Sequence, residues 1–208
     1  MYKNPHFEEK DIEKVLAFMQ AHSFITLIGY SGDYPVATQI PVKIEQRAGE
    51  IYLIGHVMKK TDHYQAFAIN ENVLALFTGA HAYVSASVYV EPAVASTWNY
   101  SSVQAKGKIK LLNDHETREV IKELTNRYED PATSKAAFHH MSEEYIEKNL
   151  KAISGFEILV NNIQSVFKLS QNHPSANRAN IIDHLAKSEE LNDQQVADDM
   201  KRATPKRS

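Results

Sequence analysis

The chain has 208 residues, a formal net charge of −3 and 43% hydrophobic residues, enough to bury one sizeable core in a single main domain. This slightly acidic balance argues against a surface built wholly for nucleic acid or anionic membrane, although it leaves room for a local basic patch. The absence of cysteine excludes disulfides, thiolate metal sites and cysteine nucleophiles. Because the N-terminus has no apolar signal core and no run approaches the roughly 18 apolar residues of a membrane span, we expect a soluble cytoplasmic protein.

The first third of the chain predicts a helix followed by strands. Apolar residues recur at helical spacing over 8–20, which indicates an amphipathic helix on a larger body. A strand is predicted over 24–30, and after the turn SGDYP an alternating strand runs over 35–44. Pro41 cannot donate to a neighbouring strand, so this segment is either an edge strand or a place where a ligand approaches free backbone.

A strand-to-helix corner follows. The strand ends near His56, the chain crosses Lys59 and Lys60, and Thr61 is expected to cap a helix. Helix N–H groups, partial positive charge and two ammonium groups would then converge, as an anionic ligand such as a phosphate monoester requires. A competing interpretation is a solvated lysine pair in a surface turn, and the charge of Asp62 opposes an anion.

The middle of the chain returns to strands, predicted over 73–78, 82–90 and 96–112, the last as one bent strand or two. Asn113 is expected to open a helix with Glu116 as its capping-box partner and with apolar residues as far as Tyr128 facing inward. Ser142 is expected to cap a short helix, and a last strand runs over 155–168. Six or more short strands with inserted helices favour a closed barrel over a doubly wound sheet.

The C-terminal segment predicts two short amphipathic helices within 171–200. Their spacing is superficially that of a helix-turn-helix, but no Arg, Asn and Gln set stands at a helix N-terminus to read bases. A DNA reader and a peripheral helical pair are the two interpretations. We predict a barrel domain over 1–170, a helical extension over 171–200 and a basic, disordered tail over 201–208.

Known catalytic signatures are absent: the sequence contains no GxSxG, HExxH, Walker or GxGxxG pattern, and its ten histidines have no recognised metal spacing. No metal site is predicted. One polar, aromatic segment combines stacking area with donors, as sites for flat heterocycles do: Trp98, Asn99 and Tyr100. A second polar set follows the last strand: Lys168, Ser170 and Gln171. The alternatives are an interface aromatic for the first set and a network that satisfies buried backbone for the second.

Six blocks carry a family resemblance over nearly the whole chain, to about Leu185. In order they are MYKNPHFEEKD, GHVMKKTDHY, FTGAHAYVSASVY, STWNYSSVQAKGKI, LKAISGFEI and FKLSQNHPSANR. Together they resemble the PaiB-like negative transcriptional regulators, relatives of the FMN-binding split-barrel proteins. The resemblance implies a mainly β fold with peripheral helices (α+β), a split β-barrel that forms a homodimer with FMN between its subunits. The family is named for repression of protease production and sporulation genes.

The resemblance also implies a cofactor site, and the chain departs from the family there. His56, Lys59 and Thr61 fall where such proteins have His, Arg and Asn in a block usually written HLARANP, and Asp62 stands at its proline. Lysine lacks the bidentate phosphate geometry of arginine, and Asp62 adds a repelling charge. Backbone from Thr38, Gln39, Ile40 and Pro41 is expected to contact the flavin ring and the corner from His56 to Thr61, including Lys60, to take the phosphate. Trp98, Asn99, Tyr100, Lys168, Ser170 and Gln171 are expected to complete the site.

Three functions remain open at this stage. The first is a flavin-binding regulator or sensor that acts with DNA or a regulatory partner. The second is an FMN-dependent oxidoreductase of the same fold, in which hydride chemistry belongs to the cofactor and no side chain identifies a substrate. The third is a cofactor-free dimeric barrel that has lost its flavin site. Fold alone does not choose among them.

Overall fold

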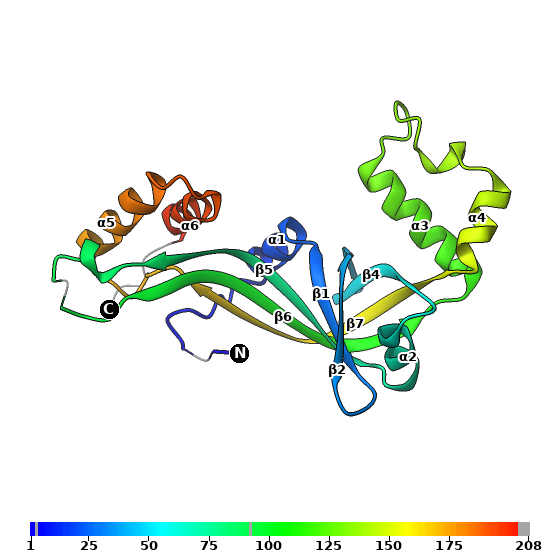
Figure 1. Ribbon diagram of the computed structural model, residues 1–208, viewed down its shortest axis with the longest axis horizontal. Helices are drawn as coiled ribbons and strands as arrows, with labels where there is room; N and C mark the ends of the chain where they lie inside the picture. The colour runs from blue at the N-terminus through cyan, green and yellow to red at the C-terminus, as the bar shows by residue number, and fades with distance from the viewer. Residues whose placement is uncertain (3, 92, 204–208) are drawn as a thin grey trace. The chain divides into compact units, whose positions relative to one another are not determined.

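The computed structural model describes residues 1–2, 4–91 and 93–203, and it contains one seven-stranded sheet (Figure 1). Its strands are β1 (Phe24–Tyr30), β2 (Pro35–Pro41), β3 (Lys43–Arg47), β4 (Glu50–Met58), β5 (Asn72–Val84), β6 (Thr97–Leu111) and β7 (Ile153–Lys168). They are ordered β2-β1-β5-β6-β7-β4-β3. The order has two ends, β2 and β3, so the hydrogen-bond ladder of the described strands is open, as in a split barrel and unlike the closed barrel that strand count alone favours.

Six α-helices accompany the described strands: α1 (Ile12–Ala21), α2 (Asp62–Ile69), α3 (Asp114–Tyr128), α4 (Glu143–Leu150), α5 (Ser175–Ala186) and α6 (Leu191–Arg202). Two short 3₁₀ helices, η1 (Ala86–Val88) and η2 (Phe138–His140), lie between them. The predicted caps of α2, α3 and α4 are confirmed, since the side chains of Thr61, Asn113 and Ser142 each accept a first-turn N–H. Among the described helices, none has the length and apolarity needed to cross a bilayer.

The chain divides into two compact units, to both of which β5, β6 and β7 contribute. Unit 1 contains Met1–Phe18, Thr78–Val103 and the chain from Gln164 onward, and unit 2 contains Met19–Phe77 and Gln104–Ile163. The partition into a barrel over 1–170 and an extension over 171–200 stays a prediction. Of the predicted tail 201–208, Lys201 and Arg202 belong to α6, and residues 204–208 lie outside the described residues.

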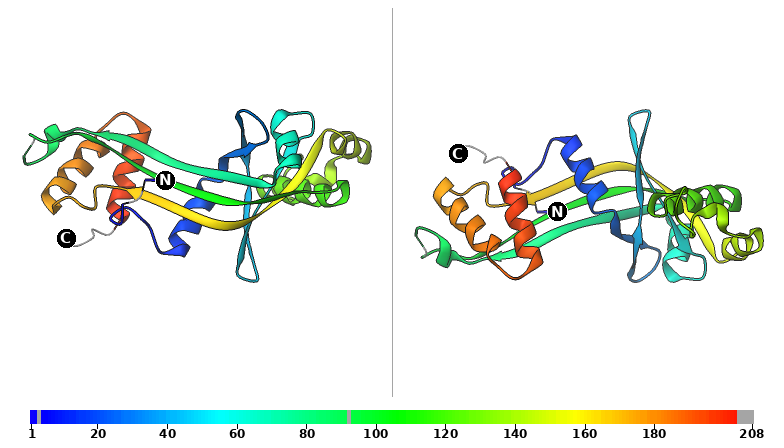
Figure 2. Two further views of the ribbon diagram at one scale, coloured as in Figure 1. Left: turned by 90° about the horizontal axis from the view of Figure 1, so that it is seen from below. Right: turned by 90° about the horizontal axis from the view of Figure 1, so that it is seen from above.

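Unit 1 has a core formed by helices on the second half of β5. Apolar residues of β5 and of the helices α5 and α6 form one buried cluster: Ala82, Val84, Ile181, Leu185, Val196 and Met200. The two helices lie side by side in both views of Figure 2, drawn in orange and red. Arg178 of α5 is 5% exposed and donates to the carbonyls of Leu169, Met200 and Ala203 at 2.7, 2.7 and 3.2 Å. This buried guanidinium therefore joins α5 to the end of β7 and to the end of α6.

Unit 2 has a core on the inner face of the β2-β1-β5 part of the sheet. Ile25, Leu27 and Ala75 are at most 1% exposed, and they alternate with outward residues along their strands. Helix α2 packs on β1 and β2. A Cβ at Gly29 would lie 2.6 Å from the ring of Phe67, so only glycine lets this helix come so close to β1.

Several predictions differ from the structure. The strand expected over 73–78 and the first part of the one expected over 82–90 are a single strand, β5, because the chain does not turn at Gly79, where a Cβ would lie 2.9 Å from the Phe18 ring. The rest of 82–90 is not a strand: β5 ends at Val84, and the Ser85 side chain caps the 3₁₀ helix η1. The strand expected over 35–44 is interrupted at Val42, whose N–H donates to the Ser23 carbonyl at 2.9 Å. Tyr128, expected to face inward, is 62% exposed because it ends α3 beyond the buried stripe of that helix.

Candidate functional site

The β4–α2 corner has the predicted strand-to-helix geometry. Thr61 donates its hydroxyl hydrogen to the Met58 carbonyl at 2.8 Å and accepts from the Tyr64 N–H at 3.3 Å. Its extended backbone, with φ −131° and ψ 158°, is typical of an N-cap. The positive end of the α2 dipole therefore lies at this corner.

Two N–H groups of the first turn of α2 have partners within the protein, contrary to what the sequence suggests. The N–H of His63 donates to the carboxylate of Asp62 at 2.7 Å, and the N–H of Tyr64 donates to Thr61. Asp62 is exposed and begins the helix, where a carboxylate complements the dipole. The Asp62 carboxylate therefore occupies a position at which a phosphate oxygen would accept a hydrogen bond from α2.

The two corner lysines differ in their surroundings. The Lys59 ammonium donates to the Leu150 carbonyl at 2.8 Å and to the Asp114 carboxylate at 3.0 Å, and the Lys59 N–H donates to the Ala152 carbonyl at 2.8 Å. Lys60 is exposed and has no acidic partner within the described residues. Lys60 is therefore the corner cation whose ammonium is available to an anion.

Pro41, at the end of β2, lies close to β4 on one face, and the His56 side chain of β4 lies on the opposite face. A Cβ at Gly55 would lie 3.0 Å from the Pro41 carbonyl oxygen, so the end of β2 comes very close to β4 at a glycine. Since successive strand residues face opposite sides, the imidazole of the neighbouring His56 points to the other face. Its Nδ1 is buried without a partner, and burial lowers the pKa of His56.

The β2 strand has no hydrogen-bonded strand on one of its two sides among the described residues. It stands at one end of the described sheet and pairs with β1, from Phe24 opposite Pro41 to Tyr30 opposite Pro35. Along it, Thr38 and Pro41 are half-buried, Gln39 is exposed and Ile40 is buried. An unpaired strand edge presents both donors and acceptors, which suits the polar edge of a flat heterocycle.

The predicted site residues from the later part of the chain belong to unit 1. Asn99 is fully buried. Its amide nitrogen donates to the Ser170 hydroxyl at 2.9 Å, and that hydroxyl lies within hydrogen-bond distance of the amide oxygen, at 3.1 Å. Ser170 has a left-handed φ of 55°, and Gln171 accepts from the Leu169 N–H at 2.8 Å. Asn99, Ser170 and Gln171 therefore satisfy the turn that leaves β7.

An exposed aromatic cluster lies on neighbouring strands of unit 1. Trp98 and Tyr83 are each 52% exposed, with ring centroids 5.6 Å apart at an edge-to-face angle, and His81 lies 6.0 Å from Trp98. Sequence reasoning singled out Trp98 but missed Tyr83 and His81, although both share its outward position in a period-2 pattern. Tyr100 is half-buried, and Lys168 donates to the Thr97 hydroxyl.

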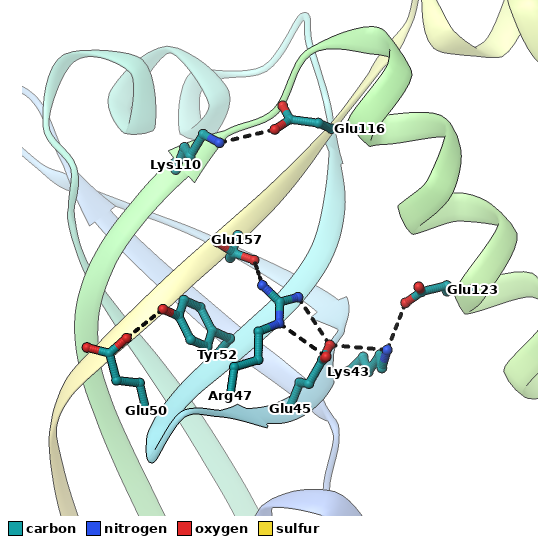
Figure 3. A network of polar contacts seen from close by, with 9 residues as sticks. All are labelled: Lys43, Glu45, Arg47, Glu50, Tyr52, Lys110, Glu116, Glu123 and Glu157. Atoms are coloured by element: carbon teal, nitrogen blue, oxygen red, sulfur yellow. Dashed lines mark hydrogen bonds and ion pairs between the residues drawn. The ribbon is translucent and has the colours of Figure 1, made fainter.

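Polar side chains of β3, β4, β6, β7 and α3 in unit 2 are joined by ion pairs and hydrogen bonds (Figure 3). Lys43 pairs with Glu123 at 2.7 Å, and this contact raises the pKa of Lys43. Arg47 pairs with Glu45 at 3.1 Å and also with Glu157. Because every cation of this network has an acidic partner, it offers little attraction to a free anion, in contrast to Lys60.

Comparison with known proteins yields one family match and several similar folds. Residues 1–162 match a family described as "Putative FMN-binding domain". The chain is 32% identical over 198 residues, 95% of each protein, to "Protease synthase and sporulation protein PAI 2" of Bacillus subtilis, which confirms the predicted PaiB-like resemblance.

Two solved structures are similar in fold. The FAD and heme binding protein of Mycobacterium smegmatis has a TM-score of 0.57 at 16% identity, over 77% of this chain and 73% of that one. The flavocytochrome Anf3 of Azotobacter vinelandii has a TM-score of 0.60 at 13% identity, over 80% and 72%. At such identities the similarity shows the fold alone, and it agrees with the expected split barrel.

Proposed function

The chain belongs to the family of FMN-binding domains and has the split-barrel fold of flavin-binding proteins, and from this premise we propose that it is an FMN-binding regulator or sensor. A bound FMN would supply electron-transfer chemistry, while the protein binds and orients it. The observation that carries the proposal is that, within unit 2, the end strand β2 contacts α2 and its Pro41 lies close to Gly55 of β4, the strand that leads to the cationic corner before α2.

Residues of unit 2 suit both the ring and the phosphate of FMN. Backbone groups from Thr38 to Pro41 suit the polar edge of the ring because β2 has an unpaired side. Lys60 supplies an unpaired ammonium for the phosphate, Lys59 retains one N–H beyond its two partners, and Thr61 holds the start of α2. His56, whose imidazole points to the other face of β4, is not among these contacts.

The unit 1 residues supply two different contributions. The exposed ring of Trp98, with half-buried Tyr100, offers stacking area to the flavin of a partner subunit. Asn99, Ser170 and Gln171 hold the turn after β7 in place, and Lys168 adds a cation beside Thr97. Their role in the site is thus mainly one of support.

The visible spectrum of the purified protein tests cofactor binding. We expect a flavin band, or its appearance on addition of FMN, with saturable quenching of flavin fluorescence. A protein that shows neither effect at high FMN concentration is the cofactor-free barrel instead. If flavin is bound, steady-state oxidation of NAD(P)H distinguishes the oxidoreductase, which turns over, from the regulator, which does not.

A regulatory role in the cytoplasm, exerted by a homodimer, completes the proposal. The protease synthase and sporulation protein of Bacillus subtilis supports it as a relative over 95% of the chain. Any DNA contact of the isolated protein should be weak and salt-sensitive, because the net charge is −3. Gel-shift experiments on DNA upstream of candidate target genes test this, and binding that resists about 200 mM salt would instead assign direct readout to the C-terminal helices.

A further inference from the structure

A cavity in unit 2 is lined by residues from the end of α1, the start of β3 and the second half of α3. Its volume is about 580 Å³, which is within the range of small-molecule sites. Six residues line it: Gln20, Lys43, Ile44, Glu123, Asn126 and Arg127. All six belong to unit 2, and none is among the proposed flavin contacts. The cavity is therefore a separate place in the molecule at which a ligand could bind.

Asn126 brings an unsatisfied acceptor to the wall of this cavity. Its side-chain oxygen is buried and has no hydrogen-bond partner among the residues that the structure describes. Most buried side-chain oxygens have a partner, because burial without one costs the free energy of desolvation. An N–H donor from a ligand in the cavity would supply the missing hydrogen bond.

Arg127 adds a guanidinium that has no acidic partner in the described part of the chain. One of its five N–H groups donates to the Val42 carbonyl at 3.2 Å. Glu123, four residues earlier on α3, has the spacing that favours an ion pair with Arg127. It pairs instead with Lys43 at 2.7 Å (Figure 3). The remaining N–H groups of the guanidinium therefore suit the two oxygens of a carboxylate.

The other lining residues narrow the chemistry of the ligand. The lining has two cations, Lys43 and Arg127, and one anion, Glu123. One carboxylate oxygen of Glu123 accepts from Lys43, and its other oxygen can accept from a ligand ammonium. A phosphate ester offers acceptors alone, so it would leave the Asn126 oxygen without a donor and would be repelled by Glu123.

We propose that this cavity binds a small carboxylate that also carries N–H donors, as a free amino acid or a short peptide does. The carboxylate binds Arg127, an N–H donates to the Asn126 oxygen, and the ammonium faces Glu123. The inference goes beyond the proposed flavin function and does not depend on it, because the two sets of residues are different.

Titration calorimetry of the full-length protein with L-leucine and with glycyl-L-leucine tests the proposal. At least one of the two probes should bind saturably, with a dissociation constant on the order of 1 mM or lower. The tighter of the two probes identifies a single amino acid or a peptide as the source of the ligand. The amide form of that probe, which lacks the carboxylate, should bind at least about 10-fold more weakly. No saturable binding of either probe, or equal binding of the amide, overturns the proposal.

Two variants test whether the probe binds in this cavity. Arg127→Gln should weaken binding by at least about 10-fold. Its matched control, Arg118→Gln, removes a guanidinium of the same helix that pairs with Glu143 at 2.7 Å outside the cavity, and it should bind the probe as wild type does.

Asn126→Leu should weaken binding without lowering the melting temperature, because the oxygen that it removes has no partner to lose. Binding of wild-type strength in both Asn126→Leu and Arg127→Gln overturns the proposal. The titrations are repeated with and without added FMN. A protein that binds the probe but no flavin supports the cavity and contradicts the proposed function, and the reverse result contradicts the cavity alone.

Discussion

The ammonium of Lys59 donates a hydrogen bond to the main-chain carbonyl of Leu150 at 2.8 Å, and this contact ties the β4–α2 corner to the last residue of α4. A second bond, to Asp114 at 3.0 Å, ties the same ammonium to the first residue of α3. Lys59 therefore has a structural task besides any contact with a ligand. The next residue, Lys60, is exposed and makes no such contact with any residue that the structure describes, so substitutions of the two lysines should have different effects.

Lys60→Ala should weaken FMN binding without affecting the fold. A charge-assisted hydrogen bond contributes roughly 1.5–3 kcal/mol, so the dissociation constant for FMN should rise on the order of 10- to 150-fold. Riboflavin, which lacks the phosphate, should bind almost as before, and the melting temperature should not change because the side chain is exposed. Fluorescence-quenching titrations with the two flavins measure this. Equal weakening of both flavins would remove Lys60 from the phosphate site.

Lys59→Ala should affect both binding and stability. Loss of its bonds to Leu150 and Asp114 should lower the free energy of unfolding by about 1 kcal/mol, the typical net value of a hydrogen bond in a protein. FMN binding should also weaken, by a factor in the same 10- to 150-fold range if the third N–H contacts the phosphate. Denaturant unfolding and the two flavin titrations separate these effects. If riboflavin and FMN lose affinity equally, Lys59 supports the fold and not the phosphate.

The sequence predicted local features of the fold well and distant contacts poorly. The caps at Thr61 and Asn113 were predictable because a cap depends on residues within three or four positions. The partners of Lys59 lie 55 and 91 residues away, so no local pattern indicates that its ammonium is occupied. The break expected between the strands over 73–78 and 82–90 is absent, and the packing of Gly79 against Phe18 that fills this place is also a distant contact. The corner itself was also predictable from local pattern, and the family resemblance added its assignment to a flavin site, because whole sequence blocks carry nonlocal information.

Asn113→Ala should lower stability through loss of the capping box of α3. The Asn113 side chain accepts from the Glu116 N–H at 2.9 Å, and the Glu116 carboxylate accepts from the Asn113 N–H at 3.0 Å. Removal of such a cap typically costs about 1 kcal/mol. Urea unfolding followed by circular dichroism measures the change. Asn113→Ser, which keeps a capping oxygen, is the control and should retain most of the stability; an equal loss in both variants would mean that the cap is not responsible.

His56→Gln should flatten the dependence of stability on pH below about 6.5. Burial lowers the pKa of His56 from its ordinary value of 6.5, so the unfolded chain takes up a proton that the folded chain resists. Stability is therefore full above pH 6.5 and falls as the pH decreases towards the lowered pKa. The variant loses this contribution, although His173, whose pKa is also lowered mainly by burial, leaves a residual slope. Thermal melts between pH 5 and pH 8 measure it, and identical slopes in both proteins would contradict the assignment.

Asp62→Asn should tighten FMN binding, because it removes a negative charge from the place where the phosphate would bind. The Asp62 carboxylate accepts from the His63 N–H at 2.7 Å, at the positive end of α2. A phosphate at the corner carries roughly −1.5 to −2 charges and must approach this carboxylate. Removal of a like charge at an exposed site is worth about 1 kcal/mol, or roughly fivefold in affinity, after solvent screening.

Three comparisons test whether the effect of Asp62→Asn is electrostatic. The gain should be confined to FMN, since riboflavin carries no phosphate. It should shrink in about 1 M salt, where the screening length falls to about 3 Å. Stability should fall slightly, by roughly 0.3–1 kcal/mol, because the carboxylate complements the helix dipole. A variant that binds FMN no more tightly than wild type at low salt would place the phosphate away from the start of α2.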